Sequence, residues 1–438
     1  MSRIFSISKP DTARSRRHPL LRIRYQLAGG LLLAIGAPLL ARMMLEPRVL
    51  FSINIQVTIT GVIIAHILGY MIYRRLGSFP GVANFSTILP AFLLGYGLVF
   101  VAIFFLRLDY SRFQAATSFL LSILWYFSLG MIVVRQEVNR LALVPFGAID
   151  RLEKVDNAVW HMLQTPELDS ASSSTNSASV QGVVADLRAD LPENWQRFIT
   201  GCVLSGVPVY HVKQILESLT GRVEIEHLSE NTLGSLNPNQ TYIKVKQAAD
   251  WLAALIALIA LAPLLLLVAL LVRLETAGPA LFRQERVGYR GRVFTVYKFR
   301  TMHHETHSQH ASRETAMTQK GDPRITRIGR VLRRSRLDEL PQLINILRGE
   351  MSWIGPRPEA MALSRWYENE LAFYAYRHIV RPGITGWAQV NQGHVTAVDD
   401  VHEKLHYDFY YIKNFSPWLD LVIVMRTMCI MLTGFGAR

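Results

Sequence analysis

Cysteine is scarce in this chain of 438 residues, which contains only two. Cys202 and Cys429 lie far apart and form neither a CxxC pair nor the spacing of a zinc site. This scarcity argues against a disulfide scaffold and indicates a protein body that faces the reducing cytosol.

Acidic residues are also in the minority, since 33 Asp and Glu stand against 47 Lys and Arg, for a net charge of +14. A surplus of this size suits nucleic acid, anionic lipid or a phosphorylated substrate as a partner. Half of the residues are hydrophobic and many lie in long runs, which favours the last two. We therefore expect the lipid bilayer, and no nucleic acid, among the partners.

The N-terminal region lacks the small-residue cleavage site that would follow the apolar core of a signal peptide. We therefore predict that residues 1–24 form a basic cytoplasmic tail. Residues 25–135 contain four apolar segments of about the 20 residues needed to cross a bilayer, at 25–45, 51–73, 87–106 and 114–134. The basic tail and Arg74-Arg75 favour a cytoplasmic N-terminus. The sequence thus predicts a membrane protein with a bundle of four transmembrane helices.

Residues 136–243 have a soluble composition and predict a small α/β domain of the Rossmann-like, parallel-sheet type. Its expected strands are Leu141–Val144, Gly182–Ala185 and Val207–Tyr210, and its expected helices are Asn194–Cys202 and Val212–Leu219. No GxGxxG follows the first strand, only Pro145-Phe-Gly147, so a dinucleotide site is not supported. We expect a structural or regulatory role.

The apolar run Trp251–Val272 has Pro263 at its middle and cations on both flanks. Under the positive-inside rule, both flanks are cytoplasmic. Proline removes a backbone donor and clashes with the preceding turn, so it can break a helix at mid-depth. We predict a re-entrant helix over 251–272 that breaks at Pro263 and returns to the cytoplasmic leaflet. The alternative is a kinked ordinary span, which would place residues 273–438 across the membrane.

The chemistry lies in residues 244–438, which we expect to be an α/β domain. Lys298 and Arg300 stand two residues apart, a spacing that lets an extended segment present both cations to an anion. The polar insert His303–Gly321 contains four histidines. It predicts a solvated, mobile loop, with a metal site as the alternative.

Asp338 and Glu339 follow an arginine-rich run, Ile325–Arg336, which predicts a basic amphipathic helix at a membrane surface or against phosphates. Cations beside Asp338 would lower its pKa and keep it ionised as a nucleophile. The same arginines could hold phosphate oxygens through paired hydrogen bonds. From this stretch alone, a capped, salt-bridged surface helix is an open alternative.

Three further stretches complete the region. Gly355-Pro-Arg357-Pro358 predicts a rigid turn that presents one arginine. Pro382–Asn391 combines glycines with Trp387 and Gln389, which suits a nucleobase or sugar, or else a structural turn. Trp418–Thr433 is too short and too interrupted by charge to span a membrane, so it predicts an interfacial helix.

Taken together, residues 244–438 resemble the bacterial sugar transferase family, the polyprenyl-phosphate hexose-1-phosphate transferases with a monotopic catalytic core. The motifs that carry the resemblance stand in the family's order: Lys246…Asp250, Gly278-Pro279, Gln284–Gly288, Lys298–Met302, Asp322–Thr326, Leu337–Gln342, Gly349–Pro358, Pro382–Asn391, Tyr407–Tyr411 and Trp418–Asp420. The four spans and the small α/β domain are similar to the large members, which initiate exopolysaccharide, capsule or O-antigen synthesis.

The resemblance implies a two-step reaction. Asp338 would attack the β-phosphate of a UDP-hexose and release UMP, and undecaprenyl phosphate would then take the sugar phosphate from the aspartate. Glu339 would hold Mg²⁺. The implied substrate contacts are Lys298, Arg300, Arg333, Arg357 and Gln389. No residue discriminates between glucose, galactose and an N-acetylhexosamine as the sugar.

The resemblance also implies a location, the bacterial inner membrane, with the catalytic domain held at the cytoplasmic face by the break at Pro263. Related large members suggest a homodimer. Two positions depart from the family pattern: Gln247 follows Lys246 where an arginine is usual, and Ala262 precedes Pro263 where a serine is common. The first departure puts in question how this segment grips lipid headgroups.

Two other functions fit parts of the sequence. A polytopic transferase that uses metal-bound substrates without a covalent intermediate would need aspartates in loops between many spans, and the four spans here carry essentially none. A membrane scaffold for polysaccharide assembly with an inactive catalytic domain is opposed by the intact Asp338-Glu339 pair.

Overall fold

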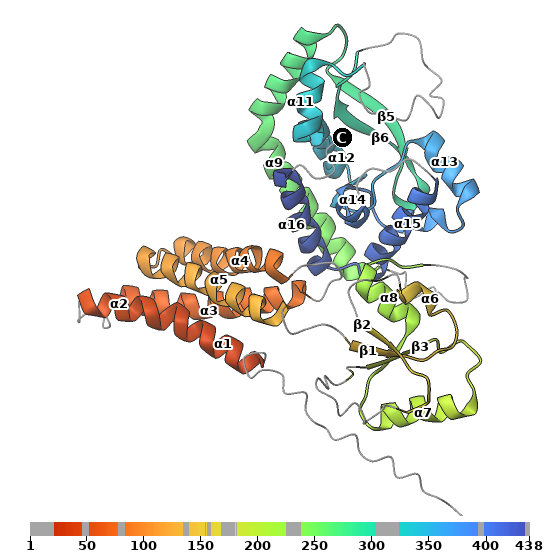
Figure 1. The fold of residues 1–438 in the computed structure, drawn as a ribbon. Helices are drawn as coiled ribbons and strands as arrows, with labels where there is room; N and C mark the ends of the chain where they lie inside the picture. The colour runs from red at the N-terminus through yellow and green to blue at the C-terminus, as the bar shows by residue number, and fades with distance from the viewer. Residues whose placement is uncertain are drawn as a thin grey trace, which may run out of the picture. The chain divides into compact units, whose positions relative to one another are not determined.

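A computed structural model describes residues 22–45, 52–77, 84–134, 140–153, 155, 159–167, 180, 182–224, 238–303, 324–392 and 398–433. The chain divides into two compact units, residues 1–221 and 222–438. The first contains the apolar N-terminal helices and a small parallel sheet, and the second contains the predicted catalytic region (Figure 1).

Four apolar helical segments open the first unit. The first consists of α1 (Ile23–Leu31), a π-helical turn (Leu32–Gly36) and α2 (Ala37–Leu45), and the others are α3 (Ile53–Leu76), α4 (Asn84–Phe105) and α5 (Arg112–Val134). Each segment is long and apolar enough to cross a membrane. The prediction of four such segments is therefore confirmed, and they indicate membrane association.

These helices pack around a core that includes Phe92 and Tyr126. Buried polar groups join them as well. Ser118 Oγ of α5 donates to the Ala34 carbonyl at 2.6 Å and so satisfies an oxygen of the π-helical turn. His66 Nε2 of α3 lies 3.2 Å from the Tyr126 hydroxyl. Because polar groups inside a bilayer are costly unless they pair, these contacts favour one arrangement of the helices.

The small sheet is parallel throughout and has the order β2-β1-β3-β4. Its elements are β1 (Arg140–Leu143), α6 (Asp150–Glu153), β2 (Val159–Met162), β3 (Gly182–Ala185), α7 (Glu193–Leu204), β4 (Val209–His211) and α8 (Val212–Thr220). Trp195 of α7 packs on one face and Ile215 of α8 on the other. The α/β prediction is confirmed, whereas the largely exposed strand β2 gives no sequence pattern that predicts it.

Asp186, directly after β3, occupies the crevice at the carboxyl ends of β1 and β3, where ligands of such sheets bind. Its Oδ2 accepts from the Ala148 N–H at 3.0 Å, in the loop after β1, and its Oδ1 accepts from the Arg188 N–H at 3.1 Å. A carboxylate at this place repels phosphate groups. The crevice therefore gives no support to a dinucleotide site.

The second unit combines a long helix, α9 (Gln240–Glu275), with two small sheets. The strands β5 (Leu281–Val287) and β6 (Val293–Phe299) form an antiparallel hairpin, and β7 (Ser352–Ile354) pairs in parallel with β8 (Gly383–Thr385). The other elements are η5 (Tyr289–Gly291), α11 (Arg327–Ser335), η6 (Leu337–Gln342), α12 (Leu343–Leu347), α13 (Met361–Glu370), η7 (Tyr374–Ile379), α14 (Trp387–Asn391), α15 (Val398–Lys413) and α16 (Pro417–Thr433). The expected α/β character and the C-terminal helix are confirmed.

α9 is one helix of 36 residues that continues through Pro263. The prediction of an interrupted helix is therefore wrong, and α9 extends beyond the predicted range at both ends. A proline inside a helix costs a hydrogen bond and a local distortion, which packing on both sides of it offsets here. Before the proline, Ala254 packs in a core with Phe294. After it, Val268 packs in a core with Leu332, so both halves of α9 contact the same unit.

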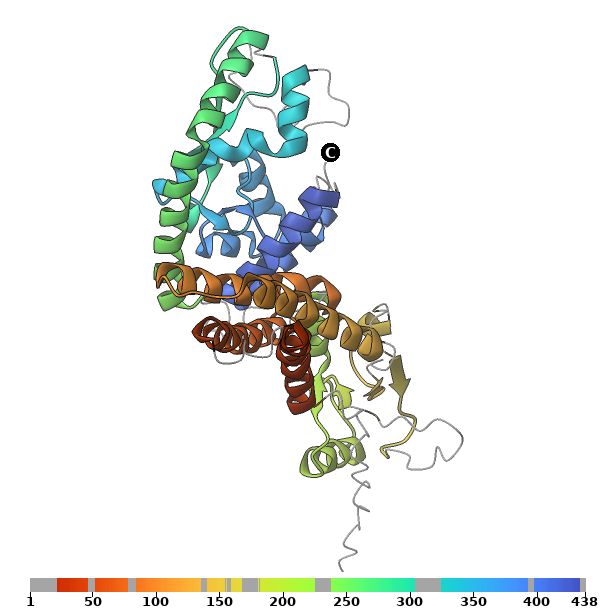
Figure 2. The same ribbon diagram turned by 90° about the vertical axis from the view of Figure 1, so that its left-hand side faces the viewer.

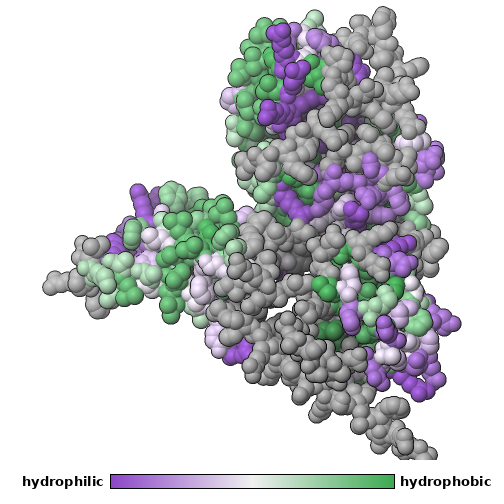
Figure 3. Space-filling view, viewed as in Figure 1, coloured by the Kyte–Doolittle hydropathy of each residue, from purple (hydrophilic) through white to green (hydrophobic). Residues whose placement is uncertain are grey.

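The opposite face of α9 is apolar and uncovered within this unit. Ile256, Ile259, Leu266 and Leu270 are each more than half exposed. α9 runs along the edge of the unit (Figure 2), and apolar side chains line it beside the hydrophilic residues of α11 (Figure 3). An uncovered apolar stripe of this length marks an interaction surface. By length and composition, α9 is a fifth helix able to cross a membrane.

Candidate active site

The acid pair lies on η6, the turn that follows α11. Thr326 caps the start of α11, and its Oγ1 accepts from the Gly329 N–H at 2.9 Å. The helix ends at Ser335, and the next residue, Arg336, has a φ of 58° in the left-handed region that side chains disfavour. Beyond this turn, Asp338 and Glu339 are only 9% and 5% exposed. The alternative of a solvated surface helix is therefore wrong for the acid pair, while the predicted basic helix is present as α11.

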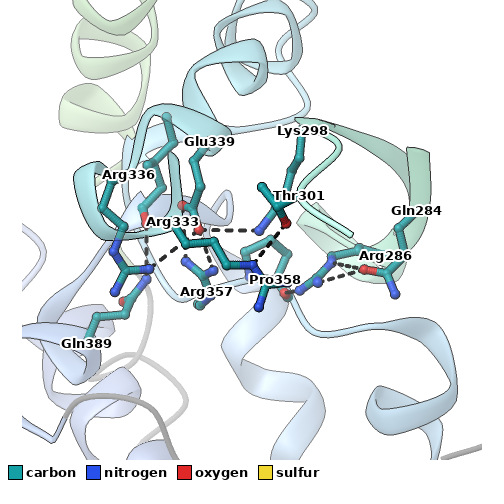
Figure 4. Close-up of polar contacts among 11 residues, drawn as sticks. Gln284, Arg286, Lys298, Thr301, Arg333, Arg336, Glu339, Arg357, Pro358 and Gln389 are labelled. Carbon is teal, nitrogen blue, oxygen red and sulfur yellow. Dashed lines mark hydrogen bonds and ion pairs between the residues drawn. The ribbon is translucent and has the colours of Figure 1, made fainter. Parts of the chain in front are cut away.

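Glu339 is held by cations from several elements (Figure 4). Arg357 donates to both carboxylate oxygens, at 3.3 Å from Nη1 and 2.7 Å from Nη2. Lys298 Nζ lies 3.3 Å from Oε1, and Arg336 Nη1 lies 3.7 Å from it. Burial raises the pKa of Glu339, but Arg357 and Lys298 outweigh burial and hold that pKa below its ordinary value. Glu339 is therefore ionised and holds the surrounding cations by ion pairs.

Asp338 behaves differently from its neighbour. Burial, and then the charge of Glu339, raise the pKa of Asp338 against the opposite effect of the nearby cations. The prediction of a lowered pKa is therefore wrong, because burial and the charge of Glu339 together outweigh the cations, which do lower it. Among the residues that the structure describes, the buried Oδ1 of Asp338 has no hydrogen-bond partner. That oxygen is available to a group that the protein itself does not supply.

Lys298, near the end of β6, is the cation of the site whose pKa lies nearest neutrality. Burial lowers the pKa of Lys298 against the opposite effect of Glu339, and the net value is about 8. Repulsion from Arg357 and Arg286 contributes to this lowering. The charge of Lys298 therefore depends on pH just above neutrality.

Arg300 does not join this cluster. Its Nη1 donates to the Ala277 carbonyl and its Nη2 to the Thr276 carbonyl, both at 2.7 Å, so the guanidinium binds backbone oxygens at the C-terminal end of α9. Because β6 ends at Phe299, the alternation that would direct Lys298 and Arg300 to one face stops there. The structure gives Arg300 a structural contact in place of the predicted phosphate contact.

The remaining predicted contacts lie around the acid pair. Arg333 Nε donates to Thr301 Oγ1 at 2.9 Å, and both residues appear in Figure 4, as does Gln389. The Oε1 of Gln389 is buried and has no partner among the described residues. Trp387 is 1% exposed and stacks on Tyr410, so it is unavailable to a nucleobase. For Trp387, the structural alternative is confirmed.

Close backbone packing builds the turn that carries Arg357. The Gly355 N–H donates to β8 at 2.9 Å, and the Gly383 N–H donates to the Pro356 carbonyl at 3.0 Å. A Cβ on Gly383 would lie 2.1 Å from the Gly355 nitrogen, so the turn could not keep its place with a larger residue there. The predicted rigid turn is confirmed.

Two arginines that the sequence does not predict as site residues hold the same turn. Arg286 Nη1 donates to the Pro358 carbonyl, and Arg377 Nη2 donates to the Arg357 carbonyl at 2.9 Å. Arg286 lies in the motif Gln284–Gly288, and this motif could have identified Arg286 as a site residue from the sequence. No local pattern marks Arg377, because its contact depends on the packing of η7 against the turn.

A further charge cluster fastens the start of α9. Lys246 Nζ lies 2.8 Å from Asp420 Oδ2 and 3.6 Å from Asp250 Oδ2. Lys246 is 8% exposed. It therefore joins α9 to α16 inside the unit and does not reach out to lipid headgroups.

Metal ligands are limited in this region. Over the described ranges, no group of three or more His, Cys, Asp or Glu side chains could hold a metal ion. The acid pair supplies at most two carboxylates, and Glu339 already pairs with Arg357. Mg²⁺ commonly takes one or two carboxylates together with substrate phosphates and water. The pair thus fits this ion only when substrate phosphates complete the site. The insert after His303 lies outside the described residues.

The profile of the bacterial sugar transferase family matches residues 241–434, which include the acid pair and its cations. A protein of Aeromonas hydrophila, named UDP-N-acetylgalactosamine-undecaprenyl-phosphate N-acetylgalactosaminephosphotransferase, is 45% identical over 383 residues, 87% of this chain and 88% of the relative. The UDP-glucose:undecaprenyl-phosphate glucose-1-phosphate transferase of Caulobacter vibrioides is 45% identical over 44% of this chain and 71% of its own length. That of Escherichia coli is 38% identical over 49% of this chain and 44% of its own length.

These matches define the protein as a sugar transferase. The chain belongs to the bacterial sugar transferase family, among the large members, which have an additional N-terminal region.

Proposed function

We propose that the protein transfers a sugar 1-phosphate from a UDP-hexose to undecaprenyl phosphate through a covalent intermediate on Asp338, and thereby initiates an exopolysaccharide, capsule or O-antigen. The carrying observation is the buried Oδ1 of Asp338, which has no hydrogen-bond partner within the described ranges and lies beside a cluster of cations. The names of the relatives supply the two substrates. The sugar in the names of these relatives is N-acetylgalactosamine or glucose.

Two displacements at one phosphorus make up the proposed reaction. A carboxylate oxygen of Asp338 attacks the β-phosphorus of the UDP-sugar, and the bond to the UMP oxygen breaks, so that UMP leaves with the electron pair. A phosphate oxygen of undecaprenyl phosphate then attacks the same phosphorus, and Asp338 leaves as a carboxylate. Both steps bring anions together. Lys298 and Arg357, with Arg333 as a further phosphate contact, would offset that repulsion.

Mg²⁺ is the proposed metal, with Glu339 as its protein ligand. When bound, it would neutralise part of the phosphate charge. Substrate phosphates and water would supply the other ligands, because the acid pair offers too few. Lys298 and Arg357 would then share the Glu339 carboxylate with the metal.

We place the reaction at the cytoplasmic face of the bacterial inner membrane. Ala254 and Val268 lie on opposite sides of Pro263, yet both pack against the second unit. A straight transmembrane course would carry the later half of α9 away from a domain that lies beside its earlier half. The packing therefore supports a re-entrant course in which both ends of α9 stay at one leaflet, which for a continuous helix requires a bend at Pro263 and not a break.

The test is UMP release by the purified full chain in detergent with Mg²⁺, undecaprenyl phosphate and a panel of UDP-sugars. We expect release with UDP-N-acetylgalactosamine or UDP-glucose, its loss on addition of EDTA and its recovery with added Mg²⁺. A folded protein that releases UMP from no sugar in the panel would contradict the proposal and favour the scaffold alternative.

Lys298 should set the basic limb of the pH profile. Because Lys298 is charged below its pKa of about 8, kcat/KM for UMP release should fall as the pH rises through that value. In Lys298→Arg, the guanidinium stays charged, so the limb should move up by about one pH unit or more. Lys213→Arg in the first unit is the control and should leave the limb in place. A limb that does not move in Lys298→Arg would show that another group titrates.

A further inference from the structure

Three cations that do not contact the acid pair hold the turn from which Arg357 reaches it. They bind three successive residues, Arg357, Pro358 and Glu359, and each comes from a different element. The two preceding residues of the turn are already fixed to β8 by backbone hydrogen bonds. Every residue from 355 to 359 thus has a hydrogen bond or ion pair to another part of the unit.

Arg377 of η7 holds the first of the three residues. Its Nη2 donates to the Arg357 carbonyl at 2.9 Å. Its other donors are engaged as well, because Nε donates to Asp408 Oδ2 at 3.1 Å and Nη1 to the Tyr374 hydroxyl at 2.7 Å. Arg377 and Asp408 are 3% and 1% exposed. These bonds therefore fix the plane of the guanidinium independently of its contact with the turn.

Arg286 of β5 holds the second residue through the Pro358 carbonyl. Its Nε and Nη2 both donate to Gln284 Oε1, at 3.2 and 2.7 Å, and this pair of bonds sets its orientation. The next residue of β5, Val287, donates its N–H to the Glu359 carbonyl at 3.4 Å. The strand thus binds the turn at two points.

Lys404 of α15 holds the third residue through an ion pair with the Glu359 carboxylate. Both side chains are largely buried. Although burial raises the pKa of Glu359, Lys404 and two arginines hold that pKa below its ordinary value. Glu359 therefore stays ionised, and the ion pair persists at neutral pH.

This arrangement has a consequence for catalysis. A long arginine side chain can adopt many rotamers, so the position of its guanidinium depends on how firmly its backbone is held. A displacement of about 1 Å at a reacting centre can cost about 10²-fold in rate. We propose that Arg286, Arg377 and Lys404 are positioning residues, which fix the backbone of the turn and so direct the Arg357 guanidinium toward Glu339 and the substrate phosphate. The inference rests on the proposed function, because it assigns roles within the same reaction.

The test is a double-mutant cycle on UMP release by the purified full chain. Arg377→Lys and Arg286→Lys keep the charge but lose the planar fork of donors. In the wild-type background, each should lower kcat/KM by about 10- to 100-fold. In the Arg357→Lys background, the guanidinium to be directed is already gone. There each should cost no more than about 2-fold beyond the loss caused by Arg357→Lys itself.

Arg381→Lys is the matched control. Arg381 also donates to a backbone carbonyl, that of Gly349 at 2.9 Å, but lies outside the turn. Its replacement should leave kcat/KM within about 2-fold of wild type.

Equal losses for the Arg377 and Arg286 variants in both backgrounds would overturn the inference, because general support of the fold acts independently of Arg357. If Arg377→Lys does not fold, Arg286→Lys carries the same comparison. A wild type that releases no UMP would overturn the proposed function itself, whereas an active wild type without coupling would overturn only the positioning roles.

Discussion

Asp338→Asn should lower the rate of UMP release by roughly 10³-fold or more, because it removes the proposed nucleophile. The amide has the size of the carboxylate but does not attack phosphorus. We expect the fold to be at least as stable as that of the wild type. Burial and Glu339 raise the pKa of Asp338, so its charged form opposes folding at neutral pH and its removal relieves that cost. The apparent midpoint of thermal unfolding should therefore stay equal or rise.

A label on the β-phosphate distinguishes a covalent role of Asp338 from an electrostatic one. With a UDP-sugar that carries ³²P at this phosphate, and without lipid, the wild type should keep the label after denaturation, whereas Asp338→Asn should not. Asp190→Asn, at an exposed position of the first unit, is the control and should retain both turnover and label. Turnover that survives in Asp338→Asn would contradict the covalent step. So would a wild type that releases UMP but never becomes labelled.

Local patterns in the sequence account for the elements that could be predicted. The four N-terminal segments follow from runs of apolar residues, and strands β1, β3 and β4 of the small sheet follow from short apolar runs between turns. The basic helix before Asp338 follows from arginines at helical spacing. Lys298, Glu339 and Arg357 are far apart in the chain, and their grouping came from a resemblance to a family, since no spacing brings them together.

Features that depend on tertiary packing could not be predicted in this way. Pro263 predicts a broken helix, but contacts on both sides of it keep α9 continuous. The cations before Asp338 predict a lowered pKa, but burial and then the neighbouring carboxylate reverse the direction of the shift. Arg300 is drawn to the end of α9 by free carbonyls that only the fold brings near. In each case, burial or packing that only the fold creates decides the outcome.

The Arg357–Glu339 pair should also dominate the stability of the second unit. Glu339 is 7% exposed in its side chain, and Arg357 makes its shortest contact, at 2.7 Å. Arg357→Ala would leave a buried carboxylate whose remaining cations, in the part of the chain that the structure describes, are Lys298 and Arg336, at 3.3 and 3.7 Å. We expect a loss on the order of 2–5 kcal/mol in the free energy of unfolding, because an uncompensated buried charge is costly. The apparent midpoint of chemical unfolding, followed by tryptophan fluorescence in detergent, measures this loss.

The double variant Arg357→Ala/Glu339→Gln identifies the cause of that loss. If the unpaired charge is responsible, removing it should restore most of the stability, while UMP release stays low because both site residues are gone. Glu403→Gln is the control, since Glu403 belongs to a far more exposed pair with Arg222, and its loss should cost about 1 kcal/mol or less. A double variant no more stable than Arg357→Ala would show that the guanidinium stabilises the turn by packing. In that event, Glu339 could exchange Arg357 for a metal ion at little cost to the stability of the fold. If the double variant instead recovers stability, any ion that replaces Arg357 must supply an equivalent positive charge.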